Sequence, residues 1–240
     1  MIRLIPMLLV LALPALAQPL SVTQREEVIR IIREALVQDP SILRDAIAAM
    51  QAADEAAAAQ AAQAALATHR AALERDPADP VAGNPDGDVT VVVFVDPRCG
   101  YCKQLHPSLQ ELVKRDPKLR LVVKDIPILG PNSVLAARAL LAAHAQGKHQ
   151  ALLDAVMALR VEPTEAVLKA EGEKIGLDWA RLRKDMDSAA VSDRLGVNLA
   201  LAQTLGVRGT PAIVIGDALI PGAVGLADLQ AAVASARQRG

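Results

Sequence analysis

The stretch VTVVVFVDPRCGYCKQLH, residues 89–106, contains both cysteines of this 240-residue chain. Its first seven residues, Val89 to Val95, form an unbroken run of mostly β-branched side chains, which is typical of a strand buried on both faces. From Cys99 to about Lys114 the pattern is that of a helix. The two cysteines therefore lie where a buried strand gives way to a helix.

The segments that follow extend this unit into an α/β fold. Residues 119–124 predict a second strand, and a strand, a helix and a strand in this order predict two parallel neighbours in one sheet. A long helical stretch follows over about 133–205, with breaks near 147, 163, 176 and 188. The sequence TPAIVIGDALIPG then predicts a hairpin with strands at 212–215 and 218–220, and a last helix covers about 226–237.

The chain begins with the features of a secretory signal peptide. Arg3 supplies a positive charge, residues 5–13 are apolar, and Ala15 to Ala17 form a small-x-small cleavage signal. The apolar run is too short to span a bilayer core of about 30 Å. We therefore expect residues 1–17 to be removed after Ala17 and the mature protein to be exported, to the periplasm, where thiols tend to form disulfides.

Residues 18–76 predict an all-helical arm. Thr23 and Glu26 fit a capping box, an apolar stripe follows from Val28, and the stretch around Asp39 and Pro40 divides the arm into two helices. Residues 52–67 are mostly alanine, which favours a helix but buries little. The stripe must pack on the rest of the chain or on copies of itself, and a Pro-, Gly- and Asp-rich linker at 77–87 favours self-association into a homo-oligomer.

The two cysteines fit a redox couple better than a metal site or a structural crosslink. A cysteine in the first turn of a helix is stabilised as the thiolate by free backbone N–H groups and the helix dipole, so we expect Cys99 to face solvent and attack, and Cys102 to be shielded. A structural zinc site needs four ligands, but the chain has no other cysteine and His106 adds only a third. A crosslink over two residues removes little unfolded-chain entropy.

Other classes of function find little support in the composition. A net charge of −1 and three aromatic residues argue against nucleic-acid binding. We find no phosphate-binding loop, no HExxH motif and no serine nucleophile elbow, and we expect neither a cofactor nor a resident metal. His106, His144 and His149 are expected at the surface, and Asp96 as a turn residue.

The sequence CGYC after a valine strand, the block VRGTPAIVIGDALIPGAVG and the helices between them resemble the DsbA-type thiol-disulfide oxidoreductases of the bacterial periplasm. Residues 124–148, KDIPILGPNSVLAARALLAAHAQGK, are similar to the subgroup that includes suppressor-of-copper-sensitivity protein C (ScsC). The resemblance implies a thioredoxin fold over residues 88–240 with a helical insertion at about 131–206. The N-terminal helical segment of that subgroup drives oligomerisation in some members.

The resemblance also assigns roles to individual residues. It implies that Cys99 is the nucleophile, that Cys102 is the resolving thiol and that Gly100 and Tyr101 tune the couple. From the residues alone, a proline that opens a strand is either a plain edge residue or a functional one. The resemblance implies a cis-proline at Pro211, with Thr210 before it in contact with substrate and with the reactive sulfur.

The direction of catalysis stays open at this stage. Many DsbA-type members carry a glutamate six residues before the first cysteine, where this chain has Val93. The segment around the cysteines and Thr210 look closer to disulfide isomerases of the DsbC and DsbG type, so we favour an isomerase or reductase. A dithiol oxidase is the alternative, as is a Cu(I)-binding copper-tolerance protein, because thiolates are soft ligands. The expected partners are periplasmic proteins with cysteines and a membrane redox partner.

Overall fold

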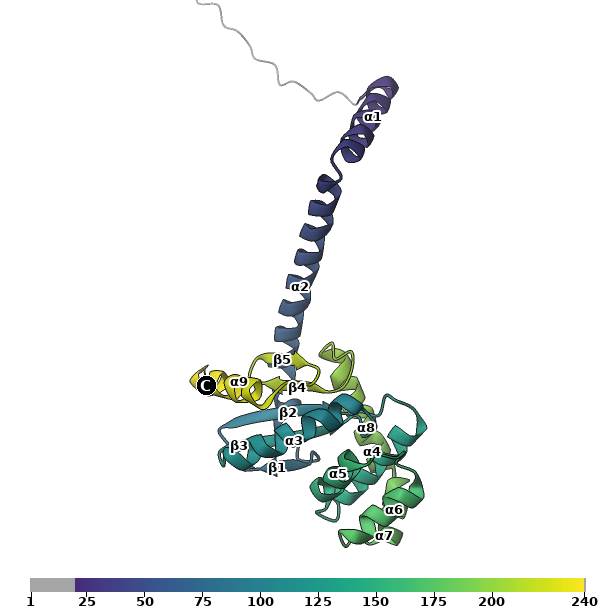
Figure 1. Ribbon diagram of the computed structural model, residues 1–240, viewed down its shortest axis with the longest axis vertical. Helices are drawn as coiled ribbons and strands as arrows, with labels where there is room; N and C mark the ends of the chain where they lie inside the picture. The colour runs from purple at the N-terminus through teal and green to yellow at the C-terminus, as the bar shows by residue number, and fades with distance from the viewer. Residues whose placement is uncertain (1–19, 240) are drawn as a thin grey trace, which may run out of the picture. The chain divides into compact units, whose positions relative to one another are not determined.

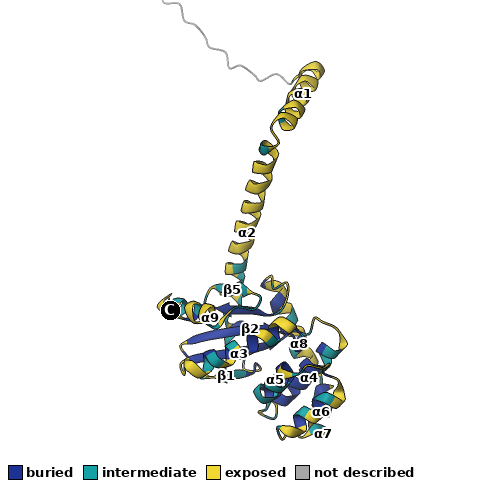
Figure 2. Ribbon diagram, in the orientation of Figure 1, coloured by how far each residue is buried: buried dark blue, intermediate teal, exposed yellow. Residues whose placement is uncertain are grey.

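The computed structural model describes residues 20–239, so the predicted signal peptide lies outside the described residues. The chain divides into two compact units between Ala56 and Ala57. The first unit contains helix α1 (Val22–Gln38) and the beginning of α2 (Ser41–Glu74). Its helices are exposed along almost their whole length, as Figure 2 shows in yellow. None of the described helices is long and apolar enough to cross a membrane.

The N-cap of helix α1 lies two residues before the position that the predicted capping box gave it. Its N-cap is Ser21, whose extended backbone (φ −64°, ψ 164°) lets the side chain accept a hydrogen bond from the backbone N–H of Gln24. The Gln24 side chain in turn accepts from the backbone N–H of Ser21, at 2.9 Å. The predicted capping box of Thr23 and Glu26 is therefore wrong, because Ser21 and Gln24 form one first.

The second unit is built on a five-stranded mixed sheet with the strand order β1-β3-β2-β4-β5. The strands are β1 (Val81–Gly83), β2 (Val89–Val95), β3 (Leu119–Asp125), β4 (Ala212–Ile215) and β5 (Ala218–Pro221). Strands β2 and β3 are parallel, and the other neighbouring pairs are antiparallel. In the centre, Val93 pairs with Val123 on one side and with Ile213 on the other. The predicted positions of β2, β3, β4 and β5 are confirmed within one residue.

Seven helices of the second unit follow β2 along the chain. They are α3 (Gly100–Arg115), α4 (Pro131–His144), α5 (His149–Ala158), α6 (Glu165–Lys174), α7 (Trp179–Met186), α8 (Ala189–Thr204) and α9 (Leu226–Arg239). Helix α3 connects β2 to β3, and α4–α8 are inserted before β4 (Figure 1). Gly147 and Gly176 have positive φ at two of the predicted breaks. The expected thioredoxin fold with a helical insertion is confirmed.

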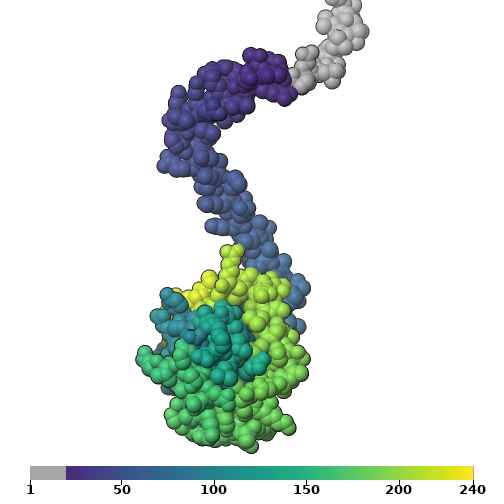
Figure 3. Space-filling model, turned by 90° about the vertical axis from the view of Figure 1, so that its right-hand side faces the viewer, coloured from purple at the N-terminus to yellow at the C-terminus, as the bar shows by residue number. Residues whose placement is uncertain are grey.

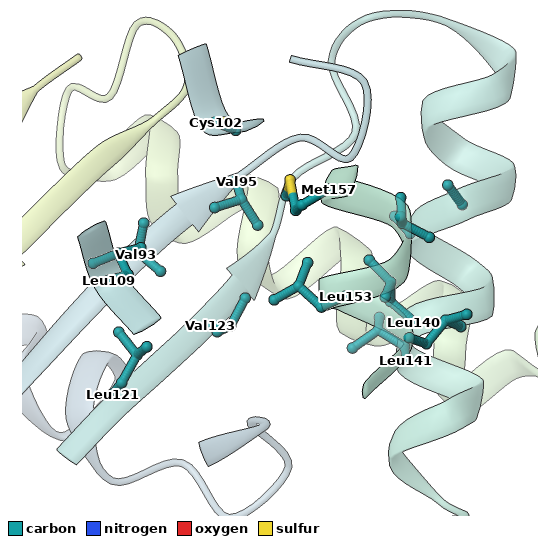
Figure 4. Close-up of a cluster of buried hydrophobic side chains, with 14 of the residues drawn as sticks. Val93, Val95, Cys102, Leu109, Leu121, Val123, Leu140, Leu141, Leu153 and Met157 are labelled. Carbon is teal, nitrogen blue, oxygen red and sulfur yellow. The ribbon is translucent and has the colours of Figure 1, made fainter. Parts of the chain in front are cut away.

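Strand β2 lies at the centre of two hydrophobic clusters. Its odd-numbered valines belong to a cluster with side chains of α3, α4, α5 and α9, and Figure 4 shows Val93 and Val95 of this set together with Leu109 and Met157. Val92 and Phe94 point to the opposite face. There they meet Leu66 and Leu73 of α2, Leu201 of α8 and Leu205, which directly follows α8. All seven residues of β2 are buried, as a strand covered on both faces requires.

The structure revises the expected boundary between arm and linker. Leu66 and Leu73 lie seven residues apart and hence on one face of α2, and both are buried against the sheet. The predicted linker at 77–87 contains strand β1, whose Val81 pairs with Val122 of β3. The end of α2 and the segment after it therefore belong to the second unit. The strand escaped prediction because it has only three residues, follows a proline and ends on a glycine.

Candidate active site

The turn between β2 and α3 places Cys99 at the first position before the helix. Cys99 is the N-cap residue of α3, with an extended backbone (φ −66°, ψ 121°), and no side chain caps this helix. Its backbone N–H donates to the carbonyl of Asp96 at 3.0 Å, and its carbonyl accepts from the N–H of Lys103 at 3.0 Å. The thiol therefore lies at the start of a helix whose first N–H groups have no side-chain cap.

Asp96 is the residue that holds this turn in place. Its carboxylate is fully buried and accepts hydrogen bonds from the N–H of Arg98 at 2.7 Å and from Ser133 Oγ at 2.8 Å. It also accepts from the N–H groups of Ile128 and Leu129, at 2.7 and 3.0 Å. Asp96 is thus more than the predicted turn residue, because it ties the cysteine turn to the loop after β3. The sequence signal was an acid at the end of a buried strand.

Both sulfur-bearing side chains are enclosed by the protein. Cys99 is 6% exposed and Cys102 is 2% exposed, and both are free thiols. The expectation that Cys99 faces solvent is therefore wrong, since its Sγ lies 3.2 Å from the carbonyl oxygen of Thr210, to which the thiol donates a hydrogen bond. Burial raises the pKa of the Cys102 thiol well above its ordinary value, so Cys102 stays protonated at neutral pH.

The segment that covers Cys99 comes from the far end of the chain. The peptide bond between Thr210 and Pro211 is cis, and β4 begins at the next residue, beside β2. Pro211 is buried, and its carbonyl accepts from the N–H of Gly222 at 2.8 Å. Segments from the middle, the insertion and the end of the chain, in teal, green and yellow-green, share one face in Figure 3. The structure thus brings Thr210 to Cys99 across 111 residues.

The remaining predicted site residues lie at the surface of the first turn of α3. Gly100 is exposed, and Tyr101 is 67% exposed. A groove lies beside this turn between α3 and the end of α5, where Lys103 Nζ donates to the carbonyl of Leu159 at 2.8 Å. A second groove follows the Thr210–Pro211 loop. Two grooves therefore lie beside the cysteine turn, one along α3 and one along the Thr210–Pro211 loop.

The predictions for two histidines are wrong. His106 and His149 are buried rather than exposed, because each has a carboxylate partner from another element that offsets the cost of burial. His106 Nε2 lies 2.8 Å from Asp154 Oδ1 of α5, and His149 Nε2 lies 3.1 Å from Asp125 Oδ2. His144 is half-buried, and burial lowers its pKa. Within residues 20–239 no group of three or more potential metal-ligating side chains comes together.

Comparison with known proteins points to one family. A family model described as the DSBA-like thioredoxin domain matches residues 90–234. A thioredoxin-like oxidoreductase from Silicibacter pomeroyi is 45% identical with a TM-score of 0.69, and the match covers 70% of this chain and 98% of that one. A linker-deletion variant of Proteus mirabilis ScsC is 28% identical with a TM-score of 0.72, over 93% of this chain and 99% of that one.

The curated relatives are longer proteins. A probable thiol:disulfide interchange protein DsbC from Bordetella avium is 31% identical over 131 residues, which is 55% of this chain and 36% of that protein. The chain also matches 24% of the length of Na(+)/H(+) antiporter NhaA 3 from Salinispora tropica, with 31% identity over 66% of this chain. The likeness therefore concerns one part of each of these proteins. By the domain match, the chain belongs to the family of DSBA-like thioredoxin domains.

Proposed function

We propose that the protein exchanges disulfides with periplasmic proteins through Cys99 and Cys102. The observation that carries the proposal is the position of Cys99 at the uncapped start of α3, with its Sγ 3.2 Å from the carbonyl oxygen of Thr210. In the reducing direction the Cys99 thiolate attacks a substrate disulfide and forms a mixed disulfide, which Cys102 resolves. Gly100, Tyr101, Thr210 and Pro211 line the place where the substrate chain lies.

Single-cysteine variants test these roles. Cys102→Ser should accumulate a mixed disulfide with a peptide disulfide substrate, because Cys99 still attacks and nothing releases it. Cys99→Ser should form no such adduct, because Cys102 is buried and its pKa is raised. Acid-quenched mass spectrometry distinguishes the two. If Cys99→Ser formed the adduct as fast as Cys102→Ser, the assignment of nucleophile and resolving thiol would be reversed.

For the direction of exchange we favour isomerase or reductase activity. Two features support this choice: the likeness of the cysteine segment to disulfide isomerases of the DsbC type, and the match to a DsbC-named relative. The oxidase alternative is supported by the DSBA-like domain match. The discriminating measurements are the reduction potential against glutathione and the rescue of a scrambled-disulfide substrate. A strongly oxidising couple without rescue favours the oxidase, and tight Cu(I) binding without any exchange favours the copper-binding alternative.

The proposal includes self-association through the first unit. Apolar side chains along α1 and the start of α2 are exposed, and they are Val28, Ile31, Ile32, Leu36, Leu43, Ile47 and Met50. Such a stripe is what a helix buries against a partner. Light scattering on the mature chain, with and without residues 18–56, tests this; a monomer in both cases would refute it. The deletion stops at 56 because Leu66 and Leu73 belong to the sheet core.

Export and the membrane partner complete the proposal. Export rests on the sequence of residues 1–17, and the mass of the protein recovered from the periplasm of an expressing cell tests cleavage after Ala17. A periplasmic couple that turns over needs a membrane protein to restore its redox state. Trapping with Cys102→Ser in cells, followed by identification of the disulfide-linked adduct, would reveal that partner.

A further inference from the structure

The two grooves beside the cysteine turn carry charge of one sign. Lys103 and Arg160 line the groove along α3, and Arg208 lines the groove along the Thr210–Pro211 loop. Among the described residues that line these grooves there is no Asp or Glu. The chain as a whole has a formal net charge of −1. The positive charge is therefore a local feature of the two grooves and not the result of a basic composition.

The cations of the grooves are accessible to a ligand. The side chains of Arg160 and Arg208 are exposed. Lys103 is half-buried, and its Nζ donates to the carbonyl of Leu159 at 2.8 Å. An ammonium group has three N–H donors, and a carbonyl partner leaves its charge in place. Both grooves thus present a positive charge to a bound chain.

Two acids lie close to the cysteine turn, but both have partners of their own. Glu162 forms an ion pair with Arg98 at 2.7 Å and accepts from Asn132 Nδ2 at 3.1 Å. Asp96 is fully buried and is bound by backbone N–H groups and by Ser133 Oγ. Neither carboxylate lines a groove, so neither cancels the charge that the grooves present.

Both grooves begin next to the sulfur of Cys99. Gly100, which directly follows Cys99, lines the groove along α3. Thr210 lines the other groove, and its carbonyl oxygen lies 3.2 Å from Cys99 Sγ. An extended chain advances by about 3.3 Å per residue. A client cysteine that reacts with Cys99 therefore brings its nearest neighbours in sequence to the two grooves.

We propose that the site prefers client cysteines that have Asp or Glu close to them in sequence, because those carboxylates bind Arg160, Arg208 and Lys103. The inference rests on the exchange reaction proposed above and names its class of substrate. Ion pairs with a guanidinium are charge-assisted and directional, and opposite charges speed the encounter of two molecules. The chemistry is unchanged: the protein dithiol is oxidised to the Cys99–Cys102 disulfide, and the client disulfide is reduced to two thiols.

The test compares peptides that differ only in charge. The reduced full-length protein is mixed with disulfide-linked peptide dimers whose cysteine is flanked on both sides by Glu, by Gln or by Lys. Acid-quenched mass spectrometry gives the rate of protein oxidation, and each rate is divided by the rate at which dithiothreitol reduces the same peptide. The variants are Arg160→Gln, Arg208→Gln and the two combined. Lys169→Gln is the matched control, because Lys169 is an exposed cation of α6 that lines neither groove.

At low ionic strength we expect the normalised rate to be about 10-fold higher with the Glu peptide than with the Lys peptide, at the low end of charge-steered association. In about 1 M salt, where the Debye length is about 3 Å, this ratio should approach one. Each single variant lowers the ratio, and the combined variant brings it near one. Lys169→Gln keeps the wild-type ratio. Alkylation of Cys99 by uncharged iodoacetamide stays the same in all of these proteins, because the cations act on the client.

Several results would overturn the inference. One is an equal normalised rate with the Glu and Lys peptides in the wild type, and another is a ratio that survives in the combined variant. A parallel fall in iodoacetamide alkylation and in the rates with every peptide would show that the cations act on the Cys99 thiol instead. If the variants do not fold, a wild-type ratio that is insensitive to salt refutes the preference. If no peptide oxidises the wild type, the proposed exchange itself fails, whereas exchange without a charge preference contradicts this inference alone.

Discussion

Replacing Leu73 with alanine should destabilise the thioredoxin unit although the residue lies in a helix that begins in the first unit. Leu73 is 1% exposed and packs in the cluster formed by Val92 and Phe94 of β2 and Leu205 beside α8. Truncation removes apolar atoms from this cluster and leaves a space that the rigid sheet fills poorly. The Leu73→Ala variant therefore tests whether the end of α2 belongs to the core of the second unit.

The expected size of the effect follows from the burial. A fully buried leucine truncated to alanine costs about 3 kcal/mol, within a range of about 2–5 kcal/mol. For a unit of roughly this size, each kcal/mol lowers Tm by about 2–4 °C, so we expect a decrease of about 6–12 °C. Thr68→Ala, at an exposed position five residues earlier on α2, should stay within about 0.5 kcal/mol of the wild type.

Urea unfolding followed by tryptophan fluorescence measures the difference. Trp179 is the only tryptophan of the chain, and it packs against the core cluster on the opposite face of the sheet from Leu73. Its signal therefore reports unfolding of the thioredoxin unit and not local fraying of α2. If Leu73→Ala and Thr68→Ala had the same free energy of unfolding, the end of α2 would not be part of this core.

Three further predictions concern buried polar groups. Asp79→Ala should cost about 3–5 kcal/mol in urea unfolding, because it leaves the fully buried Lys124 ammonium without its carboxylate partner; adding Lys124→Met should recover part of this loss. Burial raises the folded-state pKa of the Cys102 thiol. The stability that this thiol contributes to the reduced protein is therefore fully present below the ordinary thiol pKa and is lost as pH rises above it. Between pH 7 and 10, Tm should fall more in the wild type than in Cys102→Ser. Asp96→Asn should slow exchange and cost about 1–3 kcal/mol in thermal unfolding, because an amide NH₂ then faces donors that the carboxylate accepted; an unchanged Tm would contradict this role.

The elements that sequence predicted well are those with a strong local pattern. Seven consecutive residues, six of them apolar and all but one β-branched, identified β2 as a strand covered on both faces. Glycines with positive φ marked two breaks in the insertion. Strand β1 was missed because three residues carry no period, and its pairing with β3 is a long-range event. The boundary at residue 76 was misplaced because Leu66 and Leu73 look alike whether they face solvent, a partner or a sheet.

The sequence by itself indicated the fold family, through its resemblance to known oxidoreductases, and it favoured a redox couple, because the cysteine spacing, the strand before it and the helix after it are local features. Only the tertiary structure decided what surrounds the thiols. It placed the Thr210 carbonyl over Cys99, enclosed Cys102 among valines, and paired His106 with Asp154 from another helix. A side chain's burial, and with it the protonation state of a thiol or an imidazole, depends on groups distant in sequence. The groups that surround the two thiols are therefore set by the tertiary fold and not by the sequence next to the cysteines.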